Sequence, residues 1–225
     1  MEIAKTGRKK PISRGEASST DGVQGYQQRV SREKRALILE VAIATFLESG
    51  YDAATMDSIG DRATVSYATL YKHFPSKETL FVEAVDHLIH QLFSSWKDHV
   101  VPNDVEPGLR EIGRAFCELV SDARLISAMR LIIGQVRNFP AVGARFQLAK
   151  HLFSDITDAW LQRRVDEGEL HVADVQLARA EFIGMLGETV FYPRLMQTDY
   201  ALSDAQVERI VESAVCTFLA RYRVQ

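Results

Sequence analysis

Cysteines and long apolar runs are scarce in this 225-residue sequence, and each shortage excludes a class of protein. Cys117 and Cys216 are far apart and have no CxxC spacing, which excludes a disulfide framework and a zinc site of the usual kind; both are expected to be buried. No apolar run approaches the roughly 18 residues of a membrane span, so we expect no membrane contact. The basic N-terminal residues precede no apolar core, so they form no signal peptide, and we expect a cytoplasmic protein.

Motifs of enzymes are missing as well. The sequence has no nucleophile elbow, no phosphate-binding glycine loop and no HExxH motif. His87 and His90 stand three residues apart, a spacing that can hold a metal on a helix, but no carboxylate or cysteine is placed to join them. We therefore interpret them as solvent-facing histidines and expect no catalytic residue, no metal and no cofactor.

The charges are distributed unevenly, although the net charge is only −3. The first 35 residues carry nine Lys/Arg against four Asp/Glu, whereas residues 81–225 carry 15 against 20. A basic front on an acidic body suits a protein that presents one end to a polyanion. Residues 1–30 are rich in Gly, Ser, Gln and basic side chains and predict a disordered arm, which either follows a nucleic-acid backbone or is only a solvated tail.

From Ser31 onward almost every segment repeats its apolar residues with a period near 3.6, which predicts an all-α fold. We expect a first helix over residues 31–49 that ends at Gly50, a short helix capped by Thr55, a third over 66–73, and a long fourth helix capped by Ser76. Short helices joined by a tight turn at Thr64 are typical of a helix-turn-helix unit, although a small bundle that binds nothing would show the same pattern.

One segment distinguishes between these alternatives. The run TMDSIGDRATVSYATLYKHFPSKETLF (residues 55–81), together with the preceding ILEVAIATFLESGYDAA, closely resembles the DNA-binding signature of the TetR family of transcriptional regulators. The resemblance is dense over about 45 residues, far beyond a lone short motif. It implies a helix-turn-helix domain over residues 31–78, followed by a helical regulatory and dimerisation domain over residues 79–225.

The resemblance assigns Tyr67, Ala68 and Thr69 to base contacts. These small or polar side chains also suit the exposed start of a helix that enters a major groove. Contacts to the DNA backbone are assigned to hydroxyl, imidazole and ammonium groups around them, namely Thr55, Ser66, Tyr71, His73 and Lys77. Ser76 and Lys77 open the fourth helix, where free N–H groups and the helix dipole attract a phosphate.

One residue departs from the family pattern. The family usually has glycine in the turn where this chain has Thr64. If the turn needs a positive φ, a β-branched residue there costs about 1–2 kcal/mol.

The second half continues as helices, roughly over residues 107–121, 122–138, 140–167, 174–196 and 203–222. Apolar stripes on the last two helices predict a four-helix bundle across a two-fold axis, unless both stripes face the core of the monomer. The predicted interface residues are Phe182, Met185, Val207, Val211, Ala214 and Phe218. Family members dimerise through this region, and a homodimer places two recognition helices about 34 Å apart on one face of a duplex.

Aromatic and methionine side chains in the middle helices predict an apolar pocket, although such residues are more often plain core. The candidates are Trp96, Phe116, Met129, Ile133, Trp160, Phe182, Met185 and Phe191. We therefore expect a sequence-specific DNA-binding regulator, a repressor that a small hydrophobic effector releases from a palindromic operator in double-stranded DNA. Repression is implied by the family alone. The alternative is a DNA-bound adaptor controlled by a protein partner.

Overall fold

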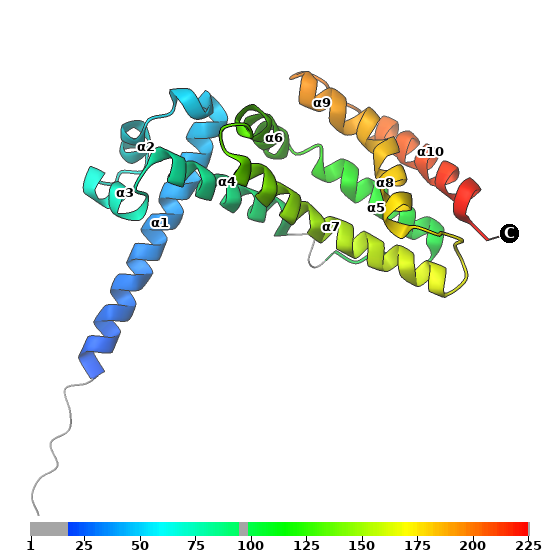
Figure 1. The fold of residues 1–225 in the computed structure, drawn as a ribbon, viewed down its shortest axis with the longest axis horizontal. Helices are drawn as coiled ribbons and strands as arrows, with labels where there is room; N and C mark the ends of the chain where they lie inside the picture. Colours follow the sequence, from blue (N-terminus) through cyan, green and yellow to red (C-terminus); the bar gives the residue numbers. More distant parts are fainter. Residues whose placement is uncertain (1–17, 95–98, 225) are drawn as a thin grey trace, which may run out of the picture.

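The computed structural model describes residues 18–94 and 99–224 and confirms the all-α prediction over these ranges, where the only β-type pairing is an isolated bridge between Leu170 and Arg223. The helices divide between a small head and a longer body (Figure 1). Those of the head are α1 (Ser18–Ala53), α2 (Met56–Arg62), α3 (Tyr67–His73) and α4 (Lys77–Ser94). Those of the body are α5 (Val105–Leu119), α6 (Ala123–Gln135), α7 (Pro140–Asp166), α8 (Val175–Leu186), the π-helix η2 (Gly187–Phe191), α9 (Tyr192–Met196) and α10 (Asp204–Tyr222).

The predicted start of the first helix at Ser31 is wrong. Helix α1 begins at Ser18, so residues 18–30, which were expected in a disordered arm, are helical; residues 1–17 lie outside the described residues. Adding a residue to an existing helix is far easier than starting one, and Gln27, Gln28 and Arg29 favour helix. Arg29 also pairs with Glu33 one turn later. The first turns of α1 project away from the rest of the molecule (Figure 1).

The head is held together by aromatic side chains at the junction of α1 and α4. Phe46 and Phe81 are buried and meet edge to face with ring centroids 5.2 Å apart, and Tyr51 packs on Phe81 at 4.8 Å. The regular part of α1 ends at Gly50, as expected, where φ is 77° and only glycine turns without strain. The predicted caps Thr55 and Ser66 precede α2 and α3.

The body follows the predicted ranges to within a few residues. Helix α10 packs between α5 and α8, and two arginines of α5 form ion pairs with it: Arg110 with Glu212 and Arg114 with Glu208. One segment was not foreseen, because residues 187–191 form a π-helix inside the helical stretch 175–196. Such segments are often found at functional sites.

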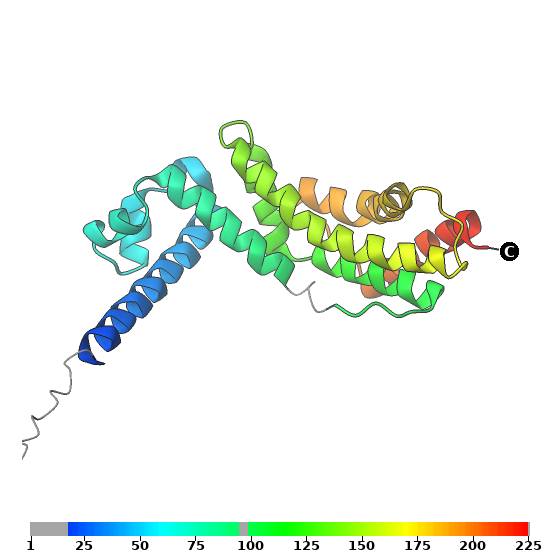
Figure 2. The ribbon, with the colours of Figure 1, turned by 60° about the horizontal axis from the view of Figure 1, so that its bottom comes forward.

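Helix α4 links the two parts. It packs against α1 of the head from its start to beyond His87, and it also packs against α6 and α7 of the body (Figure 2). The division of the chain near residue 78 remains a prediction, since α4 contributes to both sides of it. None of the helices in the described ranges is long and apolar enough to cross a bilayer.

Candidate nucleic-acid interface and apolar cavity

Helix α2 begins with a reciprocal cap at Thr55. The Ser58 N–H donates to Thr55 Oγ1 at 3.1 Å, and the Thr55 N–H donates to Ser58 Oγ at 3.3 Å. Thr55 remains exposed, and its hydroxyl proton is still available to a phosphate oxygen. The predicted backbone contact is therefore compatible with the cap.

Helix α3 exposes the residues that were assigned to base edges. Leu70, 1% exposed, anchors the helix on the head, whereas Tyr67 is 63% exposed and Ala68 is also exposed. Ser66 caps the helix, since its Oγ accepts the Thr69 N–H at 3.3 Å and lies 2.9 Å from Thr69 Oγ1. These contacts fix the first turn of α3 and present small polar groups to solvent.

Two tyrosines stack along α3. The rings of Tyr67 and Tyr71 lie 4.2 Å apart, and hydrogen bonding to Tyr67 raises the pKa of Tyr71. The Tyr71 hydroxyl therefore stays protonated near neutral pH and can donate to a phosphate oxygen. Tyr71 is half-buried, so it combines a packing role with a polar tip at the surface.

The turn between α2 and α3 has the conformation that the family glycine would suit. Thr64 adopts a φ of 53°, and the turn is closed by hydrogen bonds from the Thr64 N–H to the Asp61 carbonyl and from the Val65 N–H to the Gly60 carbonyl, each 3.1 Å long. A threonine is strained in this region because its Cβ approaches the following carbonyl oxygen. The turn is thus the family turn built with a less suitable residue.

Replacing Thr64 by glycine is expected to leave the free energy of unfolding unchanged or to raise it by up to about 1 kcal/mol. Relief of about 1–2 kcal/mol of strain offsets the greater freedom of glycine in the unfolded chain. Urea unfolding measures the difference. The matched control is Ala68→Gly, which lies in α3 and should lose about 1 kcal/mol; equal losses in the two variants would contradict the strained turn.

Ser76 caps α4, as predicted, and Lys77 is already held. Ser76 Oγ accepts the Thr79 N–H at 3.1 Å. The Lys77 ammonium donates to the Asp52 carbonyl at 3.1 Å and lies 4.4 Å from the ring centre of Tyr51. An ammonium has three protons, so two remain for a phosphate at the start of α4.

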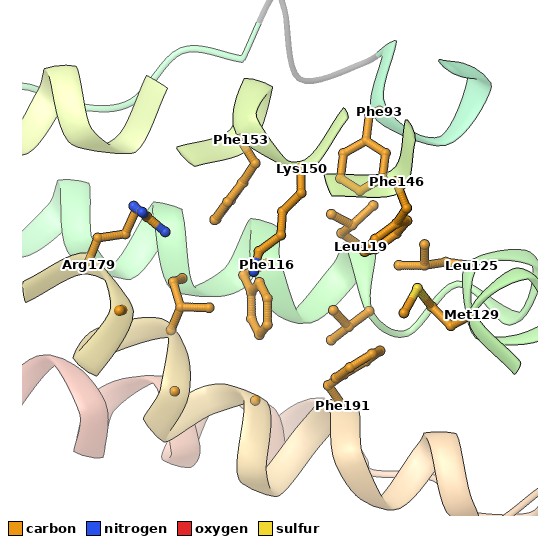
Figure 3. Close-up of a pocket in the computed structure, with 15 residues that line it drawn as sticks. Phe93, Phe116, Leu119, Leu125, Met129, Phe146, Lys150, Phe153, Arg179 and Phe191 are labelled. Atoms are coloured by element: carbon orange, nitrogen blue, oxygen red, sulfur yellow. The ribbon is translucent and has the colours of Figure 1, made fainter. Parts of the chain in front are cut away.

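An apolar cavity of about 450 Å³ lies in the body, among α4, α5, α6, α7, α8 and η2 (Figure 3). Phenylalanines supply much of its wall: Phe93, Phe116, Phe146, Phe153 and Phe191. The other lining residues are Leu119, Val120, Leu125, Met129, Lys150, Arg179, Ala180, Ile183, Gly184 and Gly187. The volume falls within the usual range of about 300–1,000 Å³ for small-molecule sites.

Some of the predicted pocket residues lie on this wall and others do not. Phe116, Met129 and Phe191 line the cavity. Trp160 and Phe182 are buried elsewhere: the indole Nε1–H of Trp160 donates to the Pro102 carbonyl at 2.7 Å, and Phe182 packs on Phe218. The remaining predictions were Ile133, which is exposed, Met185, which lies in a separate groove between α8 and α10, and Trp96, which lies outside the described residues.

Two positive charges stand at the cavity. Arg179 donates from Nε to Asp158 at 2.6 Å, so its charge is partly compensated. Lys150 has no carboxylate partner within the described ranges, and Figure 3 shows its side chain directed toward Phe116. An otherwise apolar wall with one available ammonium suits a molecule that combines a hydrophobic body with an acidic group.

Most of the predicted dimer residues face the core of their own subunit, which was the alternative interpretation of the stripes. Phe182, Val211, Ala214 and Phe218 are each at most 3% exposed within the single chain, so their side chains pack in its own core. Only the half-buried Met185 and Val207 keep access to the surface. The exposed residues of η2, α9 and α10 include Glu188, Tyr192, Met196, Ser213, Thr217 and Ala220, which we refer to together as the outward face of α8 to α10.

Two other expectations concern cysteine and histidine. Cys117 is buried, as expected, but Cys216 is exposed, so that prediction is wrong. His87 Nε2 lies 3.1 Å from Glu40 Oε1, which places the histidine in a polar contact between α4 and α1. In the part of the chain that the structure describes, no three His, Cys, Asp or Glu side chains gather as a metal site would require.

Comparisons with known proteins cover both parts of the chain. The family model for bacterial regulatory proteins of the tetR family matches residues 38–84, and the model for the C-terminal domain of AefR-like transcriptional repressors matches residues 107–224. The transcriptional repressor KstR of Rhodococcus jostii RHA1 is 32% identical over 90 residues, which are 40% of this chain and 42% of KstR. The transcriptional activator FasR of Mycolicibacterium smegmatis is 32% identical over 108 residues, which are 48% of this chain and 49% of FasR.

In these alignments the chain spans less than half the length of either curated relative. A solved structure of a TetR-family transcriptional regulator from Mesorhizobium loti MAFF303099 extends the likeness to nearly the whole fold. Its TM-score is 0.72 at 28% identity, over 86% of this chain and 98% of that one. The relatives are transcriptional regulators, which confirms the expectation that the chain is not an enzyme.

Proposed function

Because this chain belongs to the TetR family of DNA-binding transcriptional regulators, we propose that it is a homodimeric repressor of a palindromic operator and that a small hydrophobic effector releases it. The observation that carries the proposal is the pairing of two features in one chain. Helix α3, with its exposed polar side chains, directly precedes the start of α4, and the apolar cavity lies at the end of α4.

The DNA-facing surface is assembled around α3. Tyr67, Ala68 and Thr69 are proposed to contact base edges because they stand on the free side of a helix that Leu70 fixes from behind. Backbone contacts are proposed for residues whose donors remain accessible beside that face: Thr55, Ser66, Tyr71, His73 and Lys77. One α3 helix reads only a few base pairs, so useful specificity requires a second copy.

The outward face of α8 to α10, defined above, is the proposed dimer interface. It offers small side chains on α10, namely Ser213, Thr217 and Ala220, which allow close approach of a second helix pair. Tyr192 and Met196, 56% and 69% exposed, supply apolar area to the same interface. A two-fold axis through this face makes a four-helix bundle from the α8–α9 and α10 segments of two subunits.

The cavity is the proposed effector site. Its presence favours small-molecule control over control by a protein partner, for which a closed core between the middle helices would suffice. The available ammonium of Lys150 supports an effector that is a hydrophobic acid. KstR is a repressor and FasR an activator, so repression rests on the name of the C-terminal family model.

Helix α4 is the proposed connection between effector and DNA. Phe93, near its end, lines the cavity, and Lys77, at its start, belongs to the DNA-facing surface. The 18 residues between Lys77 and Ser94 span about 27 Å as a continuous helix. An effector that binds more tightly to a conformer with the wrong spacing between the two α3 helices lowers operator affinity by that difference in binding free energy.

Selection of bound sequences from random DNA tests the proposal. We expect enrichment of a palindrome whose half-site centres lie about 34 Å, one helical turn, or a multiple of it, apart. Sedimentation of the protein should give the mass of a dimer. A monomeric protein, or one that enriches no sequence even at low ionic strength, would contradict the proposed DNA binding.

A further inference from the structure

A groove of about 290 Å³ lies between the early turns of α1 and the second half of α3. Helix α1 lines it with one face, to which Tyr26, Gln27, Val30, Ser31 and Lys34 belong. Helix α3 contributes Thr69, Lys72 and His73. Three of its lining residues, Tyr26, Gln27 and Val30, belong to the helix because α1 begins at Ser18, well before the expected start at Ser31.

The groove carries positive charge without acidic compensation. Lys34 and Lys72 are exposed and have no carboxylate partner within the described ranges, and the lining contains no Asp or Glu. Two arginines nearby already have carboxylate partners, since Arg29 pairs with Glu33 and Arg35 with Glu83. Lys34 and Lys72 are therefore the cations of the groove lining that remain available to an anion.

His73 reports the same electrostatic environment. Its pKa is lowered first by burial and then by the positive charges of Arg35, Lys72 and Lys34. Groups from both helices therefore act on one imidazole, so the groove is electropositive from either side. Hydroxyl and amide groups of Ser31, Thr69 and Gln27 add donors that can form hydrogen bonds with anionic oxygens.

From this geometry we infer that the groove holds a DNA phosphate backbone and that α1 extends the DNA-binding surface through Lys34 and Lys72. The inference rests on the proposed function, because Thr69 belongs both to the groove and to the residues assigned to base edges. A helix in the major groove has a phosphate strand on either side of it. With α3 seated there, the strand on the α1 side enters the groove, where both lysines meet it.

The test uses the salt dependence of DNA affinity. The full-length protein and the variants Lys34→Gln, Lys72→Gln and the double variant are titrated with the duplex recovered by selection and with a mixed-sequence duplex. Each lysine that neutralises a phosphate contributes about 0.9 to the slope of log affinity against log salt. We expect each single variant to lower the slope by about 0.9 on both duplexes, and the double variant to lower it by about twice as much.

The chain offers a matched control in Arg32. It stands on the same helix as Lys34 and is exposed, with no ion pair to the residues that the structure describes, but it does not line the groove because its position falls on the opposite face of α1. Arg32→Gln removes one charge from the same helix and should leave the slope unchanged. The double variant Lys34→Arg with Lys72→Arg should keep the wild-type slope of log affinity against log salt, since both charges are retained.

The outcomes separate the inference from the proposed function. A wild-type protein that binds no duplex at low salt overturns the proposed function itself. A wild-type protein that binds, with Lys34→Gln and Lys72→Gln altering the slope no more than Arg32→Gln, overturns only the phosphate groove. Thermal unfolding of each variant shows whether the head remains folded; if the glutamine variants unfold, the arginine pair decides, and a lowered slope in that pair overturns the inference.

Discussion

Replacing Gly108 by alanine is expected to lower the free energy of unfolding by about 2–4 kcal/mol. Gly108 lies buried near the start of α5, directly beneath the indole of Trp160. An added Cβ would overlap Trp160 Cζ2 and come within 2.8 Å of the Pro102 carbonyl oxygen. Nothing flexible stands in its way, since the obstacles are a rigid ring and a backbone atom.

The expected loss has two physical sources. Overpacking of a close-packed core costs about 1–3 kcal/mol. The same movement would separate the Trp160 Nε1–H from the Pro102 carbonyl, which it meets at 2.7 Å, and an unpaired buried donor costs about 1–3 kcal/mol more. The better helix propensity of alanine returns only about 1 kcal/mol.

Gly134 provides the control because it lies in helix α6 with open space around its Cβ position. Gly134→Ala should raise the free energy of unfolding by about 1 kcal/mol or less. Chemical denaturation measures the change in the free energy of unfolding, which should be a loss for Gly108→Ala and a gain for Gly134→Ala. A Gly108→Ala variant as stable as the wild type would show that Trp160 does not pack on α5 in this manner.

Replacing Gly184 by phenylalanine is expected to abolish the response of operator binding to a hydrophobic acid. Gly184 lines the cavity from α8, and an added Cβ meets no atom within 4 Å, so a substitution at this position begins in open space beside the cavity. A phenyl ring there occupies space that an effector needs. The head lies at a distance from this substitution, so operator affinity without effector should remain unchanged.

The response is measured with decanoate and decanol, which share a chain length and differ in charge. In the wild type, decanoate is expected to weaken operator binding by up to about a hundredfold, equivalent to about 2.7 kcal/mol of coupling. Decanol should act more weakly because it offers no carboxylate to Lys150. The size-matched control is Gly184→Ala, which leaves most of the cavity open and should keep the response.

Two results would contradict this assignment. A full response to decanoate in the phenylalanine variant would place the effector outside the cavity. If neither compound alters thermal stability or operator affinity of the wild type, the hydrophobic acid is the wrong class of effector for this cavity.

The head was predicted almost completely from the sequence because its signals are local. Caps such as Thr55 and Ser66 act within one turn, and Gly50 and Pro75 end the helices that precede them. The early turns of α1 escaped prediction for the opposite reason. Residues 18–30 have few apolar side chains, and they extend a helix whose stability comes from packing further along the chain.

The body shows a different limit of sequence reasoning. Periodicity identifies the apolar stripes of the last helices correctly, but it does not say whether a stripe meets its own core or a second subunit. Val211 and Phe218 are buried by α5 and α8 of the same chain. Likewise, Trp160 is an aromatic residue of the kind that lines pockets, yet its ring packs directly on Gly108 and fills the space there. Such pairings across long sequence separations leave no local pattern.

The continuous α4 also constrains how such proteins can be recombined. A hybrid that joins this head to the body of another regulator within α4 must preserve the number of residues between Lys77 and Phe93. Each inserted or deleted residue turns the head by about 100° about the helix axis and shifts it by about 1.5 Å. DNA-binding heads can therefore be exchanged only between regulators whose connecting helices have the same number of residues between head and body.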